Sequence, residues 1–379
     1  MSPIYTMKNI GVDVSIIGVI LVLSTISISL YPTFLPTAVF SQSEDDTSDN
    51  NEDSDTPENS VSYGENNKFV ILTFDDGYKS QYTTAKPILD KYGYKATFYV
   101  VCNYAQKEDA DRMNWNDIQE LQKQGHDIGS HTMNHHDLTQ IPSYRIDYEI
   151  GVSKQCLLNN GINTISSFAY PFAKGSANAT IVDRVAKHYP IARTADAPLM
   201  FLDCKGWNND NEDGSDDISF TINSRTSQDD CREYSDDGNL NMVNRYTVRG
   251  WAHDSERAEN LFSDEYMVNR FKEVVDSQTE YNEDNRIKAI PIIIWHNIAN
   301  NVENDPYTTT SIDLFEAEIK YLYDNGFTVL TMDDLIYDEY NKSLKIVEGK
   351  INSDATDPSI ISQIDHPEEV KDDNKEDNT

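Results

Sequence analysis

Basic residues are scarce in this sequence of 379 amino acids, in which 31 Lys and Arg stand against 65 Asp and Glu for a formal net charge of −34. Proteins that bind nucleic acid neutralise phosphates with clustered Lys and Arg, so this balance argues against a nucleic-acid partner and favours an uncharged substrate. The acidic residues are concentrated in residues 43–64, in 203–237 and in the tail after Ser353. Such segments are typical of solvated, flexible surface.

Long apolar runs are also few. One uncharged run extends from Val14 to Leu30, after Lys8 and before the small residues near Ser41. Its length lies between that of a signal-peptide core and that of a full transmembrane helix. We therefore expect residues 1–41 to be a signal peptide or an N-terminal membrane anchor, and the protein to be extracellular or at the cell surface. A buried core helix is the alternative, but the acidic stretch 42–67, a predicted disordered linker, would separate it from any core.

Cysteine is rare as well, and none of the four cysteines stands in CxxC spacing. An even number on an exported chain permits disulfides, with three pairings. Cys204 and Cys231 bracket an acidic, turn-rich segment that a crosslink would close, which leaves Cys102 to pair with Cys156. Free buried thiols are the alternative.

The sequence has no internal repeat of solenoid period. Instead, apolar runs alternate with amphipathic stretches, and the predicted strands are 69–74, 96–101, 127–131, 167–172, 191–194, 290–295 and 327–331. This alternation predicts an α/β fold with a parallel sheet. If the sheet closes or nearly closes into a barrel, functional residues belong at the carboxyl ends of the strands. We expect one catalytic domain at 68–340 and a disordered acidic tail at 341–379.

Residues 200–244 interrupt this alternation with Asp, Asn, Gly and Ser, which predicts an acidic loop insertion. Within it, residues 210–214 resemble the start of a calcium loop. Thr221, however, occupies the position of the closing bidentate Glu. The pattern therefore favours a solvated loop over a calcium site.

Two adjacent carboxylates, Asp75 and Asp76, follow the apolar run 69–72 within the motif TFDDG. Neighbouring like charges at the end of a buried strand repel each other, and a cation or a proton would relieve the conflict. His131 and His135 have the i, i+4 spacing that lets two imidazoles close on one ion, and His136 is a competing second ligand. The pattern predicts a divalent-metal site built from Asp, His and His.

Four ordered motifs carry a family resemblance: TFDDG at 73–77, GHDIGSHTMNH at 125–135, FAYPF at 168–172 and IWHN at 294–297. Together they resemble a polysaccharide deacetylase of the NodB type, carbohydrate esterase family 4, over roughly residues 68–334. The resemblance implies a distorted (β/α)7 barrel related to the TIM barrel. It also implies a hydrolase of linear amide C–N bonds, which removes N-acetyl groups from amino sugars of an extracellular or cell-surface polysaccharide.

The resemblance further implies roles for single residues. It makes Asp75 the general base and His296 the general acid, and it implies a divalent metal, most often zinc with cobalt, manganese and nickel as others, held by Asp76, His131 and His135. The third motif implies a backbone N–H that stabilises the oxyanion, which Phe172 can supply and Pro171 cannot. Candidate aromatic platforms for sugar rings are Tyr170, Phe172 and Trp251.

Two departures from the family pattern leave questions open. Ala169, three residues before Phe172 in the third motif, stands in place of the Arg that orients the base in many members, and Arg193 and Arg249 are candidate substitutes. The Asp-Trp motif that tunes the catalytic histidine is absent in its usual form, and residues 249–254 are a candidate replacement. Two alternative functions stay open: a hydrolase of cyclic imides or other non-sugar amides on the same fold, and a non-catalytic glycan-binding module.

Overall fold

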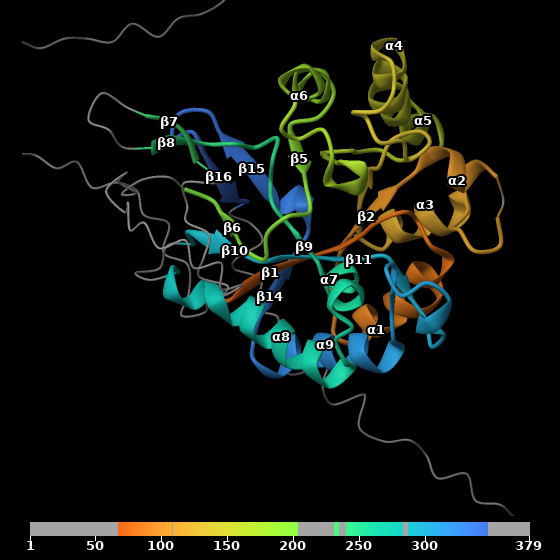
Figure 1. Cartoon of the computed structure of the whole chain (residues 1–379), viewed down its shortest axis with the longest axis vertical. Coiled ribbons are helices and arrows are strands. Elements are labelled where there is room, and N and C mark those ends of the chain that lie inside the picture. The colour runs from red at the N-terminus through yellow and green to blue at the C-terminus, as the bar shows by residue number, and fades with distance from the viewer. Residues whose placement is uncertain (1–66, 108, 204–230, 235–239, 283–286, 348–379) are drawn as a thin grey trace, which may run out of the picture. The chain divides into compact units, whose positions relative to one another are not determined.

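The computed structural model describes residues 67–107, 109–203, 231–234, 240–282 and 287–347, all within one compact unit (Figure 1). The predicted signal or anchor segment, the linker up to residue 66 and the tail from residue 348 lie outside the described residues. Within the part that is described, no helix is long and apolar enough to cross a membrane. The bounds proposed for the signal or anchor segment and for the linker therefore remain predictions.

The core of the fold is a parallel sheet with the strand order β5-β4-β3-β2-β1-β11-β9, and β14 also pairs with β1. Its strands are β1 (Phe69–Phe74), β2 (Thr97–Val100), β3 (Asp127–Ser130), β4 (Ser167–Ala169), β5 (Ile191–Arg193), β9 (Trp251–Ala252), β11 (Ile292–Trp295) and β14 (Thr328–Leu330). β11 lies along one side of β1, whereas β14 and β2 share the other side, at the start and at the end of β1 respectively. The predicted α/β class with a parallel sheet is confirmed.

One chain segment connects the two ends of this sheet. Val248 forms a parallel bridge with Arg193 of β5, supported by hydrogen bonds from Thr194 N to Val248 O (2.8 Å) and from Val248 N to Ala192 O (2.9 Å). Three residues later the same segment becomes β9, which pairs with β11. The sheet therefore curves into a distorted barrel, as the family resemblance implied.

The sequence of β1 is a nearly continuous apolar run because the whole strand is buried. Alternate side chains of a strand point to opposite faces, and both faces of this strand are buried. Val70, Leu72 and Phe74 pack into the cluster that lies against the helices, whereas Phe69 and Ile71 belong to a second cluster with side chains of the other barrel strands. Side chains therefore pack against both faces of β1, and this packing fixes the position of its carboxyl end, where Asp75 and Asp76 follow.

The helices are α1 (Lys86–Lys91), α2 (Cys102–Gln106), α3 (Trp115–Lys123), α4 (Ser143–Asp147), α5 (Ser153–Asn159), α6 (Ala179–Ala186), α7 (His253–Asn260), α8 (Asp264–Asp276) and α9 (Ile312–Asp324). α3 begins with a capping box between Asn114 and Asp117, and it ends just before Gly125, whose φ of 86° suits glycine. Two of the helical stretches between strands are irregular, because a π-helical turn at Gln81–Ala85 precedes α1 and another at Tyr148–Val152 separates α4 from α5.

The remaining described strands form two-stranded sheets: β6 (Met200–Phe201) with β10 (Ala289–Ile290), β7 (Cys231–Tyr234) with β8 (Leu240–Val243), β12 (Asn297–Ile298) with β13 (Thr309–Thr310), and β15 (Leu335–Asp338) with β16 (Ser343–Ile346). β6, β7 and β8 lie within the predicted loop insertion 200–244, which is therefore not wholly a loop. β16 lies within the tail predicted to be disordered from residue 341. That prediction is wrong for its first residues, because Leu344 and Ile346 are buried in the second cluster.

A disulfide joins Cys102 at the start of α2 to Cys156 in α5, with a Cα–Cα distance of 6.4 Å. Both sulfurs pack with Met133 in a small buried cluster. The predicted pair of Cys204 and Cys231 falls outside the residues whose side chains are described. The crosslink therefore supports the loop 131–136, which carries Met133 between the two predicted metal-binding histidines.

Candidate metal and catalytic site

The predicted site residues lie at the carboxyl ends of neighbouring strands. Asp75 and Asp76 follow β1, His131 follows β3, and His296 follows β11. In a parallel sheet these ends share one edge, so residues far apart in the sequence meet there. Figure 1 shows the ends of β2, β9 and β11 converging in this part of the molecule.

Asp76, His131 and His135 form a cluster in which one ligand atom of each residue lies within 4.8 Å of the others. Asp76 Oδ1 is 3.2 Å from His135 Nε2 and 3.6 Å from His131 Nε2. Asp76 Oδ1 is also buried and makes no hydrogen bond to any described residue. A buried carboxylate oxygen without a partner is costly, and a divalent cation between it and the two imidazoles would satisfy it.

The tautomer of His131 suits metal binding. Its Nδ1 lies 2.9 Å from the carbonyl oxygen of Ala169, and because a carbonyl can only accept, Nδ1 carries the proton. Nε2 then presents its lone pair to the cluster, in the arrangement typical of histidine ligands with an oriented second nitrogen. Burial and the neighbouring His131 lower the pKa of His135 to about 4, which keeps its imidazole neutral. The donor set therefore fits a divalent metal.

The turn that carries His135 is held by a buried carboxylate that sequence reasoning missed. Glu149 accepts hydrogen bonds of 2.8 Å each from Asn134 N, Asn134 Nδ2 and His136 Nδ1. His136, the competing ligand, is thereby engaged by Glu149 and lies outside the metal cluster. His135 itself has a φ of 60°, a left-handed conformation that costs about 1–3 kcal/mol for a residue other than glycine. The fixed neighbours maintain this geometry.

Asp75 is paired with Arg193, the last residue of β5. Arg193 Nη2 lies 2.5 Å and 2.6 Å from the two carboxylate oxygens, and the guanidinium stands 4.8 Å from the centroid of the Tyr99 ring. Burial alone would raise the pKa of Asp75, but Arg193, with His131 and His296, holds that pKa below its usual range. Of the two arginines considered from the sequence, the structure places Arg193 on Asp75, whereas Arg249 pairs with Asp196 at 3.0 Å.

His296 is paired with Asp254, which lies near the start of α7 within the segment 249–254. His296 Nδ1 is 3.0 Å from Asp254 Oδ2, and the same oxygen accepts a hydrogen bond of 2.9 Å from His296 N. Burial by itself would lower the pKa of His296, but Asp254, with Asp76 and Asp75 nearby, raises it to about 10. His296 is therefore a protonated imidazolium at neutral pH.

The candidate sugar platforms are only partly available. Tyr170 is 2% exposed and packs edge-on against Phe168, and Trp251 is 4% exposed within the core. Both were predicted as platforms, and both predictions are wrong because these rings face the interior. Phe172 is 60% exposed, and its ring centroid lies 4.5 Å from that of His135. Pro171 beside it is buried.

Gln81 is a second residue that sequence reasoning missed. Its side chain is fully buried, and Nε2 donates to the carbonyl oxygens of Asp75 (2.5 Å) and His296 (2.9 Å). One amide group thus ties together the strand ends that carry these two residues. No sequence signal marks it, because a glutamine near the start of a helical stretch is ordinarily a surface residue.

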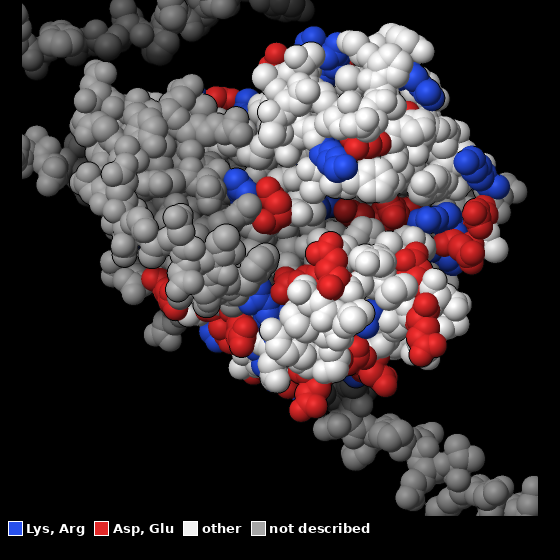
Figure 2. Space-filling view, viewed as in Figure 1, with Lys and Arg blue, Asp and Glu red and all other residues white. Residues whose placement is uncertain are grey.

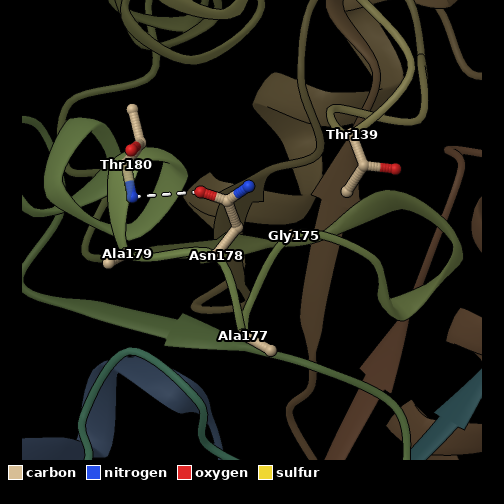
Figure 3. A pocket seen from close by; sticks show the side chains of 6 residues that line it. All are labelled: Thr139, Gly175, Ala177, Asn178, Ala179 and Thr180. Atoms are coloured by element: carbon tan, nitrogen blue, oxygen red, sulfur yellow. Dashed lines mark hydrogen bonds between the residues drawn. The ribbon is translucent and has the colours of Figure 1, made fainter.

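The face shown in Figure 2 is hollowed between the part that carries α4, α5 and α6 and the part that carries α7 and α1. Acidic side chains line this hollow, and basic side chains stand beside one end of it. A separate hollow of about 480 Å³ lies at the N-terminus of α6 (Figure 3). There, Asn178 Oδ1 accepts a hydrogen bond from Thr180 N, and the lining contains no ionisable side chain.

Comparisons with known proteins match the first part of this site. Residues 63–191 match the family model described as polysaccharide deacetylase. A peptidoglycan-N-acetylglucosamine deacetylase of Bacillus cereus is 37% identical over 71 residues, which is 18% of this chain and 30% of that protein. The chain spans 38% or less of the length of the curated relatives it matches.

Among solved structures, the deacetylase PplD of Streptococcus pyogenes, in complex with acetate, is 30% identical. That match covers 35% of this chain and 57% of PplD, with a TM-score of 0.33. A family 4 carbohydrate esterase of Streptomyces lividans, also in complex with acetate, is 17% identical, with 69% of this chain and 91% of that one covered and a TM-score of 0.41. Arg193, Asp254 and His296 lie beyond the segment that the family model matches.

Proposed function

We propose that this chain, whose residues 63–191 match the polysaccharide deacetylase family model, is a metal-dependent hydrolase that removes N-acetyl groups from amino sugars of an extracellular or cell-surface polysaccharide. The observation that carries the proposal is the unpartnered Asp76 Oδ1 facing the Nε2 atoms of His131 and His135. Beside this cluster stand an ionised carboxylate, Asp75, and a protonated imidazole, His296. These are the groups that hydrolysis of an amide requires.

A divalent metal held by Asp76, His131 and His135, with zinc as the expected ion, would polarise the acetyl carbonyl and acidify water. Asp75 accepts the proton that the attacking water loses, and Arg193 keeps this carboxylate ionised and fixed in direction. The backbone N–H of Phe172 is the proposed donor to the developing oxyanion. Together these groups support attack on the amide carbon.

The second half of the reaction needs an acid, because an amine is a poor leaving group without a proton. His296 donates its proton to the amide nitrogen as the C–N bond breaks, and Asp254 stabilises the imidazolium beforehand. Water thus supplies a hydroxyl to the acetyl carbon, and the nitrogen gains a proton. The products are acetate and a free amino sugar.

The substrate and the location belong to the same proposal. The exposed ring of Phe172 beside His135 suits stacking against a sugar, and the Bacillus cereus relative is named for N-acetylglucosamine. Export through residues 1–41 would bring the enzyme to such a glycan. The alternative of a non-catalytic module was motivated by the missing Arg at position 169 of the third motif. The contact between Arg193 and Asp75 removes that motivation.

The experiment that tests this proposal compares two bond types on one zinc-loaded preparation. We expect acetate release from N-acetylglucosamine oligomers and no ring opening of a cyclic imide such as succinimide. Imide opening without acetate release would support the alternative hydrolase. Binding to the oligomers with neither reaction would support the non-catalytic module.

Replacing Arg193 with Met is expected to lower kcat/KM at neutral pH about tenfold and to move the acidic limb of the pH profile to higher pH. The base works only above its own pKa, and the guanidinium lowers that pKa, so its removal raises the pH at which Asp75 becomes ionised. The measurement is the pH dependence of kcat/KM, with metal content determined alongside. Arg249→Met, which removes an arginine paired with Asp196 instead, should leave the acidic limb in place. An unmoved limb in the Arg193 variant would contradict the assignment.

A further inference from the structure

Arg112 is anchored directly beside the metal cluster. Its backbone forms an antiparallel bridge with Tyr78, and Met113 N donates to Gly77 O at 2.9 Å. Arg112 Nη1 also donates to the carbonyl oxygen of Asp76 at 3.1 Å. A residue distant in sequence is therefore fixed next to a metal-binding carboxylate.

The guanidinium of Arg112 lies close to two aromatic rings. Its Cζ lies 3.7 Å from the centroid of the Tyr78 ring and 4.6 Å from that of Tyr104. The Tyr104 ring is in turn 6.4 Å from the His135 ring, so the stack and the metal cluster share one rim. Contact with two aromatic rings and the hydrogen bond to Asp76 restrict the rotation of this side chain before any ligand arrives.

Arg112 is unusual among the described arginines because it has no carboxylate partner. Apart from the exposed Arg145, each of the other arginines whose side chains are described has a carboxylate oxygen within 4.0 Å, namely Arg184, Arg193, Arg245, Arg249, Arg257 and Arg270. Arg112 is half-buried, and no described acid lies within that distance. In a chain with a net charge of −34, acidic side chains are abundant. A guanidinium at the rim that pairs with none of the described acids is therefore available to bind an anionic ligand.

The remaining N–H donors of Arg112 face solvent. They are not among the buried polar atoms of the described residues that lack a partner. Because the guanidinium donates to the carbonyl oxygen of Asp76 and lies near Tyr104, whose ring is close to His135, these donors lie beside the metal cluster. A guanidinium in that state is suited to a carboxylate, which it can bind through two parallel hydrogen bonds.

We propose that Arg112 binds a carboxylate carried by the glycan on a sugar next to the N-acetylated one, so that the enzyme acts on acidic N-acetylated glycans. This inference rests on the proposed deacetylase function and narrows its substrate class. It also modifies the expectation, drawn from net charge, that the substrate is uncharged. Long-range repulsion by the acidic surface is screened beyond about 8 Å at physiological ionic strength, whereas a contact with Arg112 acts at hydrogen-bond distance.

The test compares the zinc-loaded wild-type protein with Arg112→Gln on neutral and acidic oligomers. The neutral probe is an N-acetylglucosamine oligomer, and the acidic probes alternate N-acetylglucosamine with glucuronic acid or with N-acetylmuramic acid. We expect the ratio of kcat/KM for the preferred acidic probe to that for the neutral probe to fall at least about tenfold in Arg112→Gln. Arg112→Lys, which keeps the charge and loses the fork, should give an intermediate ratio. The control is Arg145→Gln, which removes an exposed arginine on α4 and should leave the ratio unchanged.

Using the ratio separates recognition of the carboxylate from support of Asp76, because a loss of metal affinity would affect both probes equally. An unchanged ratio in Arg112→Gln and Arg112→Lys overturns the inference. If the wild type releases acetate from no probe, the proposed function fails, and the inference is then decided by equilibrium binding. At least tenfold weaker binding of the acidic probe to Arg112→Gln supports it, and equal binding overturns it. If sodium acetate alone binds at Arg112 as tightly as the acidic oligomers do, the ligand of Arg112 is the acetate product and not a carboxylate of the glycan. That result overturns the substrate assignment.

Discussion

Substituting Asp75 with Asn is expected to lower kcat by about 10² to 10⁴ while the protein keeps its divalent metal. An asparagine amide cannot accept the proton of the attacking water, yet it occupies nearly the same volume. The metal should remain because Asp75 lies outside the cluster of Asp76, His131 and His135, and its Oδ2 is 3.9 Å from His131 Nε2. The measurements are kcat for acetate release and zinc content per polypeptide.

The matched variant is Asp76→Asn, the same substitution one residue later. It replaces the carboxylate oxygen that lies 3.2 Å from His135 Nε2, so both zinc content and turnover should fall. Wild-type protein treated with a chelator should match it in activity and should recover when zinc or cobalt is added. Equal loss of metal in the two Asn variants would overturn the division of roles between these neighbouring acids.

β1 and β11 could be predicted from the sequence because each is buried along its whole length and therefore forms a largely apolar run. The irregular turns within the helical stretches could not be predicted from the sequence. The π-helical turn at Tyr148–Val152 depends on tertiary contacts, since it places Glu149 inside the fold against Asn134 and His136. β16 escaped prediction because its burial requires partners from the barrel interior, which the local sequence does not reveal.

The metal cluster and the base lie in short ordered motifs, so the sequence placed Asp75, Asp76, His131 and His135 near one another, and the structure brings them together. The partners of the catalytic groups were harder to identify. Several strand ends of a barrel can bring an arginine to the same edge, and the hydrogen bonds between Arg193 and Asp75 show that Arg193 is the one that reaches the base. Likewise, an aromatic residue in a motif can face the core or the solvent. Tyr170 faces the core, whereas Phe172 is exposed.

Replacing Asp254 with Asn is expected to lower kcat about 10²-fold near neutral pH and to move the alkaline limb of the pH profile downward. A general acid works only below its own pKa. Asp254 raises the pKa of His296 to about 10, and without that carboxylate the burial of the imidazole favours its neutral form. The acid would therefore lose its proton at lower pH, closer to the ordinary histidine value of about 6.5.

The side-chain amide introduced by Asp254→Asn could still accept the hydrogen bond from His296 N, so the variant changes mainly the charge beside the imidazole. The measurement is kcat against pH for acetate release, with zinc content as the control for the metal cluster. Arg193→Met should move the acidic limb of the pH profile to higher pH, and Asp254→Asn should move the alkaline limb to lower pH. Each variant should therefore shorten the pH range of activity, but at opposite ends. If Asp254→Asn instead moved the acidic limb, His296 would be acting as the base, and the roles of Asp75 and His296 would have to be exchanged.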